Sequence, residues 1–286
     1  MEGYGVLTLC ATPIGNLEDM TYRAVRVMKE TDIIAAEDTR HTRKLLTHFD
    51  IHTHLESYHE HNKMVKGPVL IEKLKQGKNI VLVTDAGTPG ISDPGEDIVK
   101  LALEAGIKVT AVPGAVAGII GLIISGQNTR RFSFDGFLPQ DKKERNTRLE
   151  ALKKDTNTII LYEAPHRIKK TIGYLYEGLG NRSITITREL TKRYEEVAKM
   201  YLEEALSYFK ERDPKGEYVL IIEGADQETL DQETAQSWQS ITIEDHMAQY
   251  MNQGMAEKDA MRLVAKDRGL SKRDIYQQVK IKKTIS

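Results

Sequence analysis

The order of apolar runs along this chain restricts its fold more than any other feature. Four short runs hardly alternate between apolar and polar positions, which is typical of strands buried on both faces of a sheet: 6–11, 33–36, 80–84 and 109–112. Amphipathic segments separate or flank them, near residues 21–30, 41–48, 63–76 and 95–105. Because strand and helix alternate, we expect a parallel sheet with crossover helices.

The second half of the chain has a similar composition but a less regular pattern. Apolar runs predict strands at 159–162, 184–187 and 218–222, and amphipathic segments predict helices near 115–125, 141–154 and 165–178. The length of 286 residues is sufficient for two domains. We therefore expect an α/β protein with two α/β domains and a small helical tail: 1–125, 126–225 and 226–286, with a polar, Gln-rich linker over 226–240.

Composition excludes several classes of protein. The chain has 41 Lys and Arg against 42 Asp and Glu, so its overall charge does not indicate nucleic-acid binding. A single cysteine, Cys10, rules out a disulfide framework and a cysteine-rich metal site. The N-terminus lacks the basic region of a signal peptide, and the longest apolar stretch, 115–124, is too short to cross a bilayer. We expect a soluble cytoplasmic protein with no membrane contact.

Four loops follow the predicted strands of the first domain: 12–16, 37–40, 85–95 and 113–115. Ligands of open α/β sheets bind outside the carboxyl ends of the strands, so these loops predict one crevice. The loop 85–95 holds two prolines, three glycines and two aspartates, which is more than a tight turn requires. Neither a G-x-x-x-x-G-K-[ST] loop nor a G-x-G-x-x-G turn after the first strand is present, which disfavours a nucleotide triphosphatase and a dinucleotide site.

Six of the eight histidines lie between residues 41 and 61. A zinc site is one reading of this cluster, but H-E-x-x-H is absent and no cysteine is near. We favour polar packing or substrate contact and expect no metal. Two segments are rich in basic residues, namely 129–170 and 266–286, and the second holds seven bases and two acids. Each is either a solvated helix face or a surface that contacts phosphate. Residues 257–276 resemble a helix-turn-helix whose second helix is capped by Ser271, although such turns also occur in helical bundles.

Seven strings occur in a fixed order: TLCATPIGNL (8–17), AEDTR (36–40), TDAGTPGISDPG (84–95), VPGA (112–115), YEAPHR (162–167), RELTKRYEE (188–196) and KGEYVLIIEG (215–224). Together they resemble the tetrapyrrole methylase superfamily, and within it the branch that methylates ribose 2′-hydroxyls of small-subunit ribosomal RNA. Tetrapyrrole-modifying branches carry a G-D-P loop where this chain has DAGT at 85–88, which disfavours a tetrapyrrole substrate.

The resemblance implies two α/β domains with a cofactor cleft between them, a homodimer, and S-adenosylmethionine as cofactor. The implied substrate is the ribose 2′-hydroxyl of a cytidine in the decoding region of 16S ribosomal RNA in the small subunit. The implied cofactor-binding residues are Pro13, Asp85, Ala86, Gly87, Thr88, Gly90, Ile91, Ser92, Pro113, Gly114, Ala115, Val116, Tyr162, Glu163, Ala164, Gly216 and Glu217.

Methyl transfer from a sulfonium is an in-line displacement, so positioning supplies much of the rate and neither a metal nor a covalent nucleophile is required. A base or strong acceptor would assist the weakly acidic sugar hydroxyl. The carboxylates at predicted strand ends are Glu37, Asp38 and Glu163, and the sequence does not choose among them. The residues expected to anchor RNA phosphates are Arg40, Arg167, Lys192, Arg193, Lys272 and Arg273. Two alternatives remain open, namely a methyltransferase acting on a tetrapyrrole or other small molecule, and a non-enzymatic RNA-binding protein on a methylase scaffold.

Overall fold

The first domain is built on a parallel five-stranded sheet. The computed structural model describes residues 3–238 and 241–285, without the side chains of residues 233, 234 and 280–285. The strand order is β3-β2-β4-β1-β5, and every pairing is parallel. The strands are β1 (Val6–Cys10), β2 (Ile33–Ala36), β3 (His54–Ser57), β4 (Ile80–Val83) and β5 (Lys108–Val112). The parallel sheet and the buried strands β1, β2 and β4 confirm the prediction. The burial on both faces expected for 109–112 is wrong, because β5 lies at the edge of the sheet and is largely exposed.

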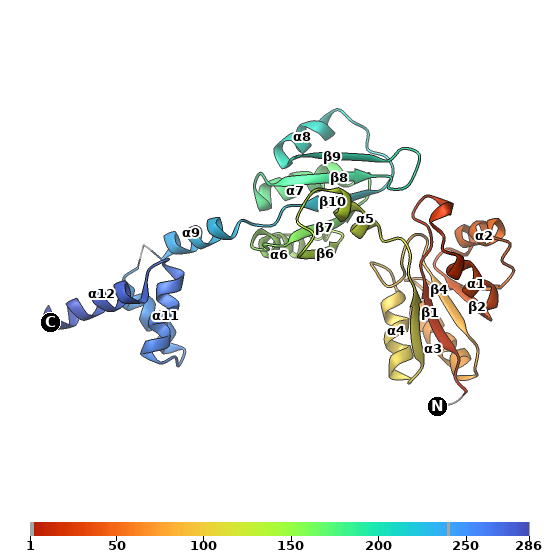
Figure 1. The fold of residues 1–286 in the computed structure, drawn as a ribbon, viewed down its shortest axis with the longest axis horizontal. Helices are drawn as coiled ribbons and strands as arrows, with labels where there is room; N and C mark the ends of the chain where they lie inside the picture. The colour runs from red at the N-terminus through yellow and green to blue at the C-terminus, as the bar shows by residue number, and fades with distance from the viewer. Residues whose placement is uncertain (1–2, 239–240, 286) are drawn as a thin grey trace.

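Helices cover both faces of this sheet (Figure 1). α1 (Tyr22–Glu30) and α2 (Thr39–His48) bury Met28 and Leu46 against one face, and α3 (Lys63–Lys75) and α4 (Gly95–Glu104) bury Leu74 and Ile98 against the other. A short 3-10 helix, η1 (Leu17–Asp19), precedes α1. Burial on both faces explains why the central strands are apolar throughout.

The second domain contains a mixed five-stranded sheet of order β6-β7-β10-β8-β9. Only β6 and β7 pair in parallel, whereas the other three pairings are antiparallel. The strands are β6 (Phe132–Gly136), β7 (Thr158–Glu163), β8 (Ser183–Arg188), β9 (Glu196–Tyr201) and β10 (Tyr218–Ile222). The three central strands were predicted, and the two edge strands were not, because their side chains are largely exposed.

Opposite faces of this second sheet pack against different helices. α6 (Lys142–Lys153), α7 (Ile168–Leu179) and α8 (Leu202–Lys210) share one apolar core. α5 (Ala117–Ile124) covers the other face, where Leu122 packs with Ile160 and Ile221. α5 thus contacts the second sheet, although it precedes the domain boundary expected at 125/126; the domain limits themselves stay a prediction.

The tail consists of four helices that lie apart from the two sheets (Figure 1): α9 (Gln227–Ser237), α10 (Ile243–Asn252), α11 (Glu257–Asp267) and α12 (Lys272–Ile285). Residues 227–237 of the linker expected over 226–240 form a helix, α9, and residues 239–240 lie outside the described residues, so the linker stays a prediction. Its Gln, Glu and Ala residues are good helix formers, and Asp226 caps the helix by accepting from the backbone N–H of Thr229 at 2.8 Å.

Helices α10, α11 and α12 share a small core of their own that includes Met247, Val264 and Ile275. Ser271 and Asp274 bond each other's backbone N–H groups, both at 3.2 Å, which confirms the predicted cap. In the part of the chain that the structure describes, no helix has both the length and the apolar character needed to cross a membrane.

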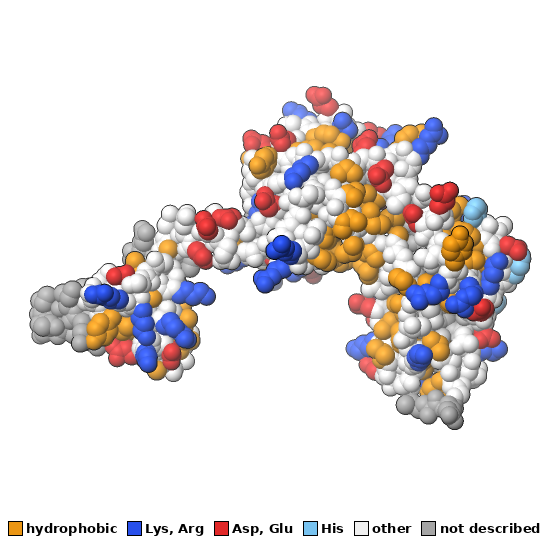
Figure 2. All heavy atoms as spheres, viewed as in Figure 1, with side chains coloured by type: hydrophobic (Ala, Val, Ile, Leu, Met, Phe, Trp, Pro, Cys, Tyr) orange, Lys and Arg blue, Asp and Glu red, His pale blue; other side chains and the backbone are white. Residues whose placement is uncertain are grey.

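Large apolar side chains gather on one exposed surface of the second domain. Ile119 and Ile123 on α5 and Phe132 and Phe134 on β6 are all exposed, and we name these four residues the apolar patch. Figure 2 shows hydrophobic atoms, in orange, gathered where Figure 1 draws α5 and β6. Contiguous apolar surface of this kind marks interaction sites.

Candidate functional site

Loops from both domains enclose a cleft of about 470 Å³, which we name the central cleft. Nine of the expected cofactor residues line it: Ala86, Gly87, Thr88, Ile91, Val116, Tyr162, Glu163, Ala164 and Glu217. Sequence reasoning missed others that also line it: Ile14, Ala117, Phe137, Pro165, His166, Tyr218 and Val219. Ile14, Pro165, His166, Tyr218 and Val219 lie within the loop 12–16 and the strings at 162–167 and 215–224, which were the signal that could have found them.

The loop 85–95 is held rigidly at the carboxyl edge of the first sheet. The Asp93 carboxylate accepts hydrogen bonds from the backbone N–H groups of Gly90 at 2.9 Å and Gly95 at 2.8 Å. Gly87 and Thr12 form two backbone hydrogen bonds with each other, at 2.8 and 3.1 Å, so the loops 12–16 and 85–95 form one wall. Backbone groups fixed in this way can bind a ligand without reorganising.

A side chain at Gly87 would be strained and would press on its neighbours in this wall. The φ of Gly87 is +83°, a conformation that L side chains rarely adopt. A Cβ there would lie 3.2 Å from the Ile14 side chain and 3.4 Å from the Ala115 carbonyl oxygen. The cleft therefore depends on glycine at this position.

Six further expected cofactor residues do not line the central cleft: Gly90, Ser92, Pro113, Gly114, Ala115 and Gly216. Two of them contact a neighbouring loop. The Thr88 hydroxyl donates to the Ala115 carbonyl at 3.0 Å, and a Cβ on Gly114 would lie 2.6 Å from that of Ala11. These positions shape the loops that the lining residues belong to.

Tyr162 forms the wall of the cleft on the second domain. Its hydroxyl accepts a hydrogen bond from the backbone N–H of Gly118 at 3.0 Å, in the first turn of α5. Phe134 and Phe137 pack edge-on against its ring, with centroids 5.0 and 6.0 Å away. Burial raises the pKa of Tyr162, so its hydroxyl stays protonated at neutral pH.

A second cavity of about 510 Å³, the side cavity, adjoins the central cleft and shares Ile14, Ala86 and Glu217 with it. Pro13 and Asp85, both expected to bind cofactor, line this cavity. α2 adds a polar rim of His41, Lys44 and His48, and the second domain adds Lys192. A ligand in the central cleft and a second molecule in the side cavity would therefore meet near Ala86.

The three candidate catalytic carboxylates have different surroundings. Asp38 is the N-cap of α2, and hydrogen bonds from the Arg40 side chain and backbone N–H lower its pKa to about 2. Glu37 is half-buried and accepts a hydrogen bond from the Thr84 hydroxyl at 2.9 Å. Asp38 is thus a weak base whose carboxylate already accepts several hydrogen bonds, whereas the carboxylate of Glu37 accepts a single one among the described residues.

The carboxylate of Glu163 is fully buried beneath the turn that follows β7. It accepts hydrogen bonds from the Thr171 hydroxyl at 2.5 Å and from the backbone N–H of Ala164 at 2.8 Å, and Arg167 lies 3.3 Å away. A carboxylate held on all sides in this way fixes the turn that lines the cleft.

The expected phosphate anchors are also unequal. Arg40 pairs with Asp38, and Arg167 donates to the Leu138 carbonyl and pairs with Glu163. Lys192 bonds Glu189 at 2.9 Å and Glu217 at 2.8 Å; burial alone would lower its pKa, but these partners raise it overall. Three anchors are exposed: Arg193 beside the Tyr194 ring, and Lys272 and Arg273 on α12.

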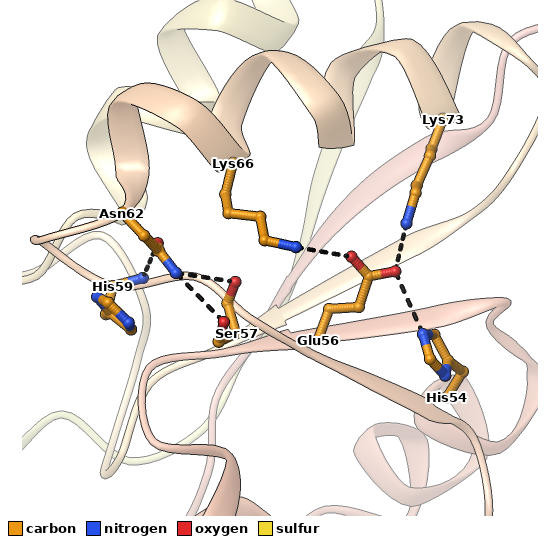
Figure 3. Close-up of polar contacts among 7 residues, drawn as sticks. All are labelled: His54, Glu56, Ser57, His59, Asn62, Lys66 and Lys73. Carbon is orange, nitrogen blue, oxygen red and sulfur yellow. Dashed lines mark hydrogen bonds and ion pairs between the residues drawn. The ribbon is translucent and has the colours of Figure 1, made fainter.

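The histidine-rich segment is organised by ion pairs around β3 and α3 (Figure 3). Glu56 pairs with Lys73, with Lys66 at 3.8 Å and with His54 at 3.3 Å. Asn62 donates to Ser57 and accepts from the backbone N–H of His59. Over residues 3–238 and 241–285, no group of three or more His, Cys, Asp or Glu is arranged to hold a metal ion.

Comparison with known proteins defines the class of this fold. The family model described as "Tetrapyrrole (Corrin/Porphyrin) Methylases" matches residues 6–206. The structure of uroporphyrin-III-C-methyltransferase from Thermus thermophilus superimposes with a TM-score of 0.56 at 18% identity, covering 76% of this chain and 94% of that one. Diphthine synthase gives a TM-score of 0.59 at 15% identity, covering 76% and 89%. The chain belongs to the tetrapyrrole methylase family.

Two relatives narrow the class further, and both are called ribosomal RNA small subunit methyltransferase I. The one from Halalkalibacterium halodurans is 51% identical over 95% of this chain and 93% of its own length. The one from Bacillus subtilis is 49% identical over 97% and 95%. Within the family, this methyltransferase therefore groups with ribosomal RNA small subunit methyltransferase I.

Proposed function

We propose that this protein transfers the methyl group of S-adenosylmethionine to the ribose 2′-hydroxyl of a cytidine in the decoding region of 16S ribosomal RNA, in the cytoplasm. The observation that carries the proposal is the junction of the central cleft with the polar side cavity, in a chain about half identical to ribosomal RNA methyltransferases. Two adjoining sites suit a reaction between two substrates.

The residues of the central cleft fit S-adenosylmethionine. Ile14, Val116 and Tyr162 offer apolar surface to a flat ring, and Gly87 keeps the loop beside them free of a side chain at its own position. A related uroporphyrin-III C-methyltransferase from Thermus thermophilus was solved with S-adenosyl homocysteine. When bound, the cofactor supplies an electrophilic methyl group, and the chain supplies its position.

We place the acceptor ribose in the side cavity. Because Asp85 lines this cavity and not the central cleft, we assign it to the acceptor hydroxyl in place of the cofactor contact that the resemblance implied. Asp85 lines the cavity and is exposed, and one of its oxygens accepts from the backbone N–H of Asp38 at 2.9 Å. Its other oxygen can accept the proton of a hydroxyl group. Glu37 is the next candidate, whereas Asp38 and Glu163 already have several partners.

An Asp85→Asn variant tests this assignment, because its amide oxygen can still accept from Asp38. We expect kcat to fall by about 10²- to 10⁴-fold, the usual contribution of a general base, with unchanged affinity for S-adenosylmethionine. Glu37→Gln is the matched comparison. Loss of activity in Glu37→Gln but not in Asp85→Asn would transfer the role to Glu37.

The apolar patch supports a homodimer. A charged residue at the centre of an apolar interface is costly to bury, so Ile123→Asp should yield monomers in sedimentation or light scattering. Leu103→Asp, at an exposed apolar position on α4, is the control and should leave the mass unchanged.

The experiment that tests the function itself is methyl transfer with labelled S-adenosylmethionine and small ribosomal subunits from cells that lack this enzyme. The expected product is one 2′-O-methylcytidine per 16S RNA, identified after digestion to nucleosides. Label in a porphyrinoid, or binding of subunits without any methyl transfer, would contradict the proposal and favour the two alternatives.

A further inference from the structure

A third pocket of about 290 Å³ lies on the second domain, on the other side of the turn that follows β7. We name it the basic pocket. It is lined by Gln140 and Arg145 near the start of α6 and by His166, Lys170 and Tyr174 on and before α7. His166 also lines the central cleft, so the two sites share a wall.

Arg145 is held in a fixed orientation within this pocket. Its guanidinium carbon lies 4.0 Å from the centre of the Tyr174 ring, and its Nη1 donates to the Gln140 carbonyl at 2.9 Å. Its Nε is buried, yet no atom of the described residues accepts from it. A buried N–H without an acceptor costs free energy, so a bound group that accepts a hydrogen bond from this arginine would stabilise it.

The charges around Arg145 favour an anion as that partner. Lys170 is exposed and lines the same pocket, whereas the charge of Arg167 is offset by Glu163. Among the described residues that line the pocket, none is acidic. Asp141, whose charge reaches Arg145, caps α6 with its carboxylate and does not line the pocket.

We propose that the basic pocket binds a backbone phosphate of the RNA substrate. The guanidinium of Arg145, which stacks on Tyr174 and lines the pocket, suits the oxygens of a phosphodiester, and the ammonium group of Lys170 in the same pocket adds a second charge. The wall shared with the central cleft places this pocket next to the proposed cofactor site. This inference rests on the proposed function and adds a site to it. The expected anchor Arg167 is already bonded to Glu163 and Leu138, so Arg145 and Lys170 in the same pocket would bind the phosphate.

Steady-state kinetics of the full-length protein on small ribosomal subunits tests the inference. Arg145→Ala should raise KM for subunits about 10- to 100-fold, as expected for a lost charge-assisted hydrogen bond, with kcat and S-adenosylmethionine affinity nearly unchanged. Arg145→Lys keeps the charge but loses the planar N–H edge, so its KM should lie between the two. The salt dependence of subunit binding should fall by about one unit in Arg145→Ala.

Two further variants separate the site from general effects. Lys170→Ala leaves the stacking of Arg145 on Tyr174 in place, so it should raise KM without lowering the melting temperature. Lys153→Ala removes an equal charge from an exposed position at the far end of α6 and should leave KM unchanged.

Several results would overturn the inference. If Arg145→Ala and Lys170→Ala both match the wild type in KM, no phosphate binds here. An equal rise in KM for Lys153→Ala would mean that only net charge matters. A weaker affinity for S-adenosylmethionine in Arg145→Ala would assign the anion to the cofactor. Inhibition of the wild type by inorganic phosphate that Arg145→Ala abolishes, with an unchanged KM, would assign the pocket to free phosphate. If the wild type itself methylates no RNA, the proposed function has failed and not merely this site.

Discussion

At the scale of single residues, Gly87 decides whether the central cleft can admit a ligand. Its φ is +83°, which strains any L side chain, and a Cβ at this position would lie 3.2 Å from the Ile14 side chain, so a larger side chain would have to displace its neighbours or extend into the cleft. We expect Gly87→Leu to abolish S-adenosylmethionine binding, measured by calorimetry, while the protein stays folded by circular dichroism.

The control for backbone strain is Gly254→Leu. Gly254 has a similar φ of +90°, but a Cβ there would meet no atom within 4 Å. It lies in the tail, so its variant should bind the cofactor normally despite the same conformational cost. Unchanged affinity in a folded Gly87→Leu protein would refute the cofactor assignment.

The histidines of residues 41–61 give a prediction about metals. Glu56 is already paired with His54 and two lysines, so the charge of its carboxylate is balanced without a metal ion. We expect full methyl-transfer activity after exhaustive chelation, measured with the same labelled cofactor. A loss of activity that zinc or magnesium restores would show that this segment, or another, binds a functional metal.

At the scale of elements, one hydrogen bond joins α5 to the second sheet. The Tyr162 hydroxyl accepts from the backbone N–H of Gly118, one of the first N–H groups of a helix, which have no partner within the helix itself. Tyr162→Phe should therefore lower the free energy of unfolding by about 1 kcal/mol, measured by urea denaturation. Tyr22→Phe, at a side chain that is 98% exposed, should change nothing; equal stabilities of the two variants would contradict the role of this bond.

At the scale of the whole molecule, the tail has its own core and stands apart from both sheets (Figure 1). Of the seven bases over 266–286, Lys266, Lys272 and Arg273 are exposed, and Arg268 donates to the carbonyls of Ile241 and Thr242. The side chains of the other three lie outside the described ones: Lys280, Lys282 and Lys283. A variant that ends at Ala225 should fold and bind S-adenosylmethionine normally, but lose much of its affinity for small subunits. Its salt slope should fall by about one unit for each phosphate contact removed.

The rival explanation for a weaker truncated protein is that the tail completes the dimer or stabilises the core. Subunit affinity, cofactor affinity, melting temperature and mass should all be measured on the same preparation. A lower melting temperature or a monomeric mass would favour the rival. Intact subunit affinity with an unchanged salt slope would refute an RNA-binding tail.

The sequence by itself determined the layered α/β architecture, because strands buried on both faces must be apolar at every position, as β2 and β4 are. It also determined the first domain's loops at the central cleft, because Gly- and Pro-containing segments follow β1, β4 and β5. The edge strands β3, β6 and β9 were missed, since an exposed edge tolerates polar residues and is stabilised by its neighbour in the sheet.

Only the tertiary structure decided which charged residues are free to act. From the sequence, Glu163 at a predicted strand end is a candidate catalytic carboxylate, and Arg167 just after it is a candidate phosphate anchor. Folding brings Thr171 and Leu138 to them, and these contacts satisfy both side chains. The same fold leaves the Nε of Arg145 without an acceptor among the described residues and turns Asp85 into the side cavity. A side chain's partners come from segments distant in sequence, and for that reason no local motif reveals whether its hydrogen bonds are already made.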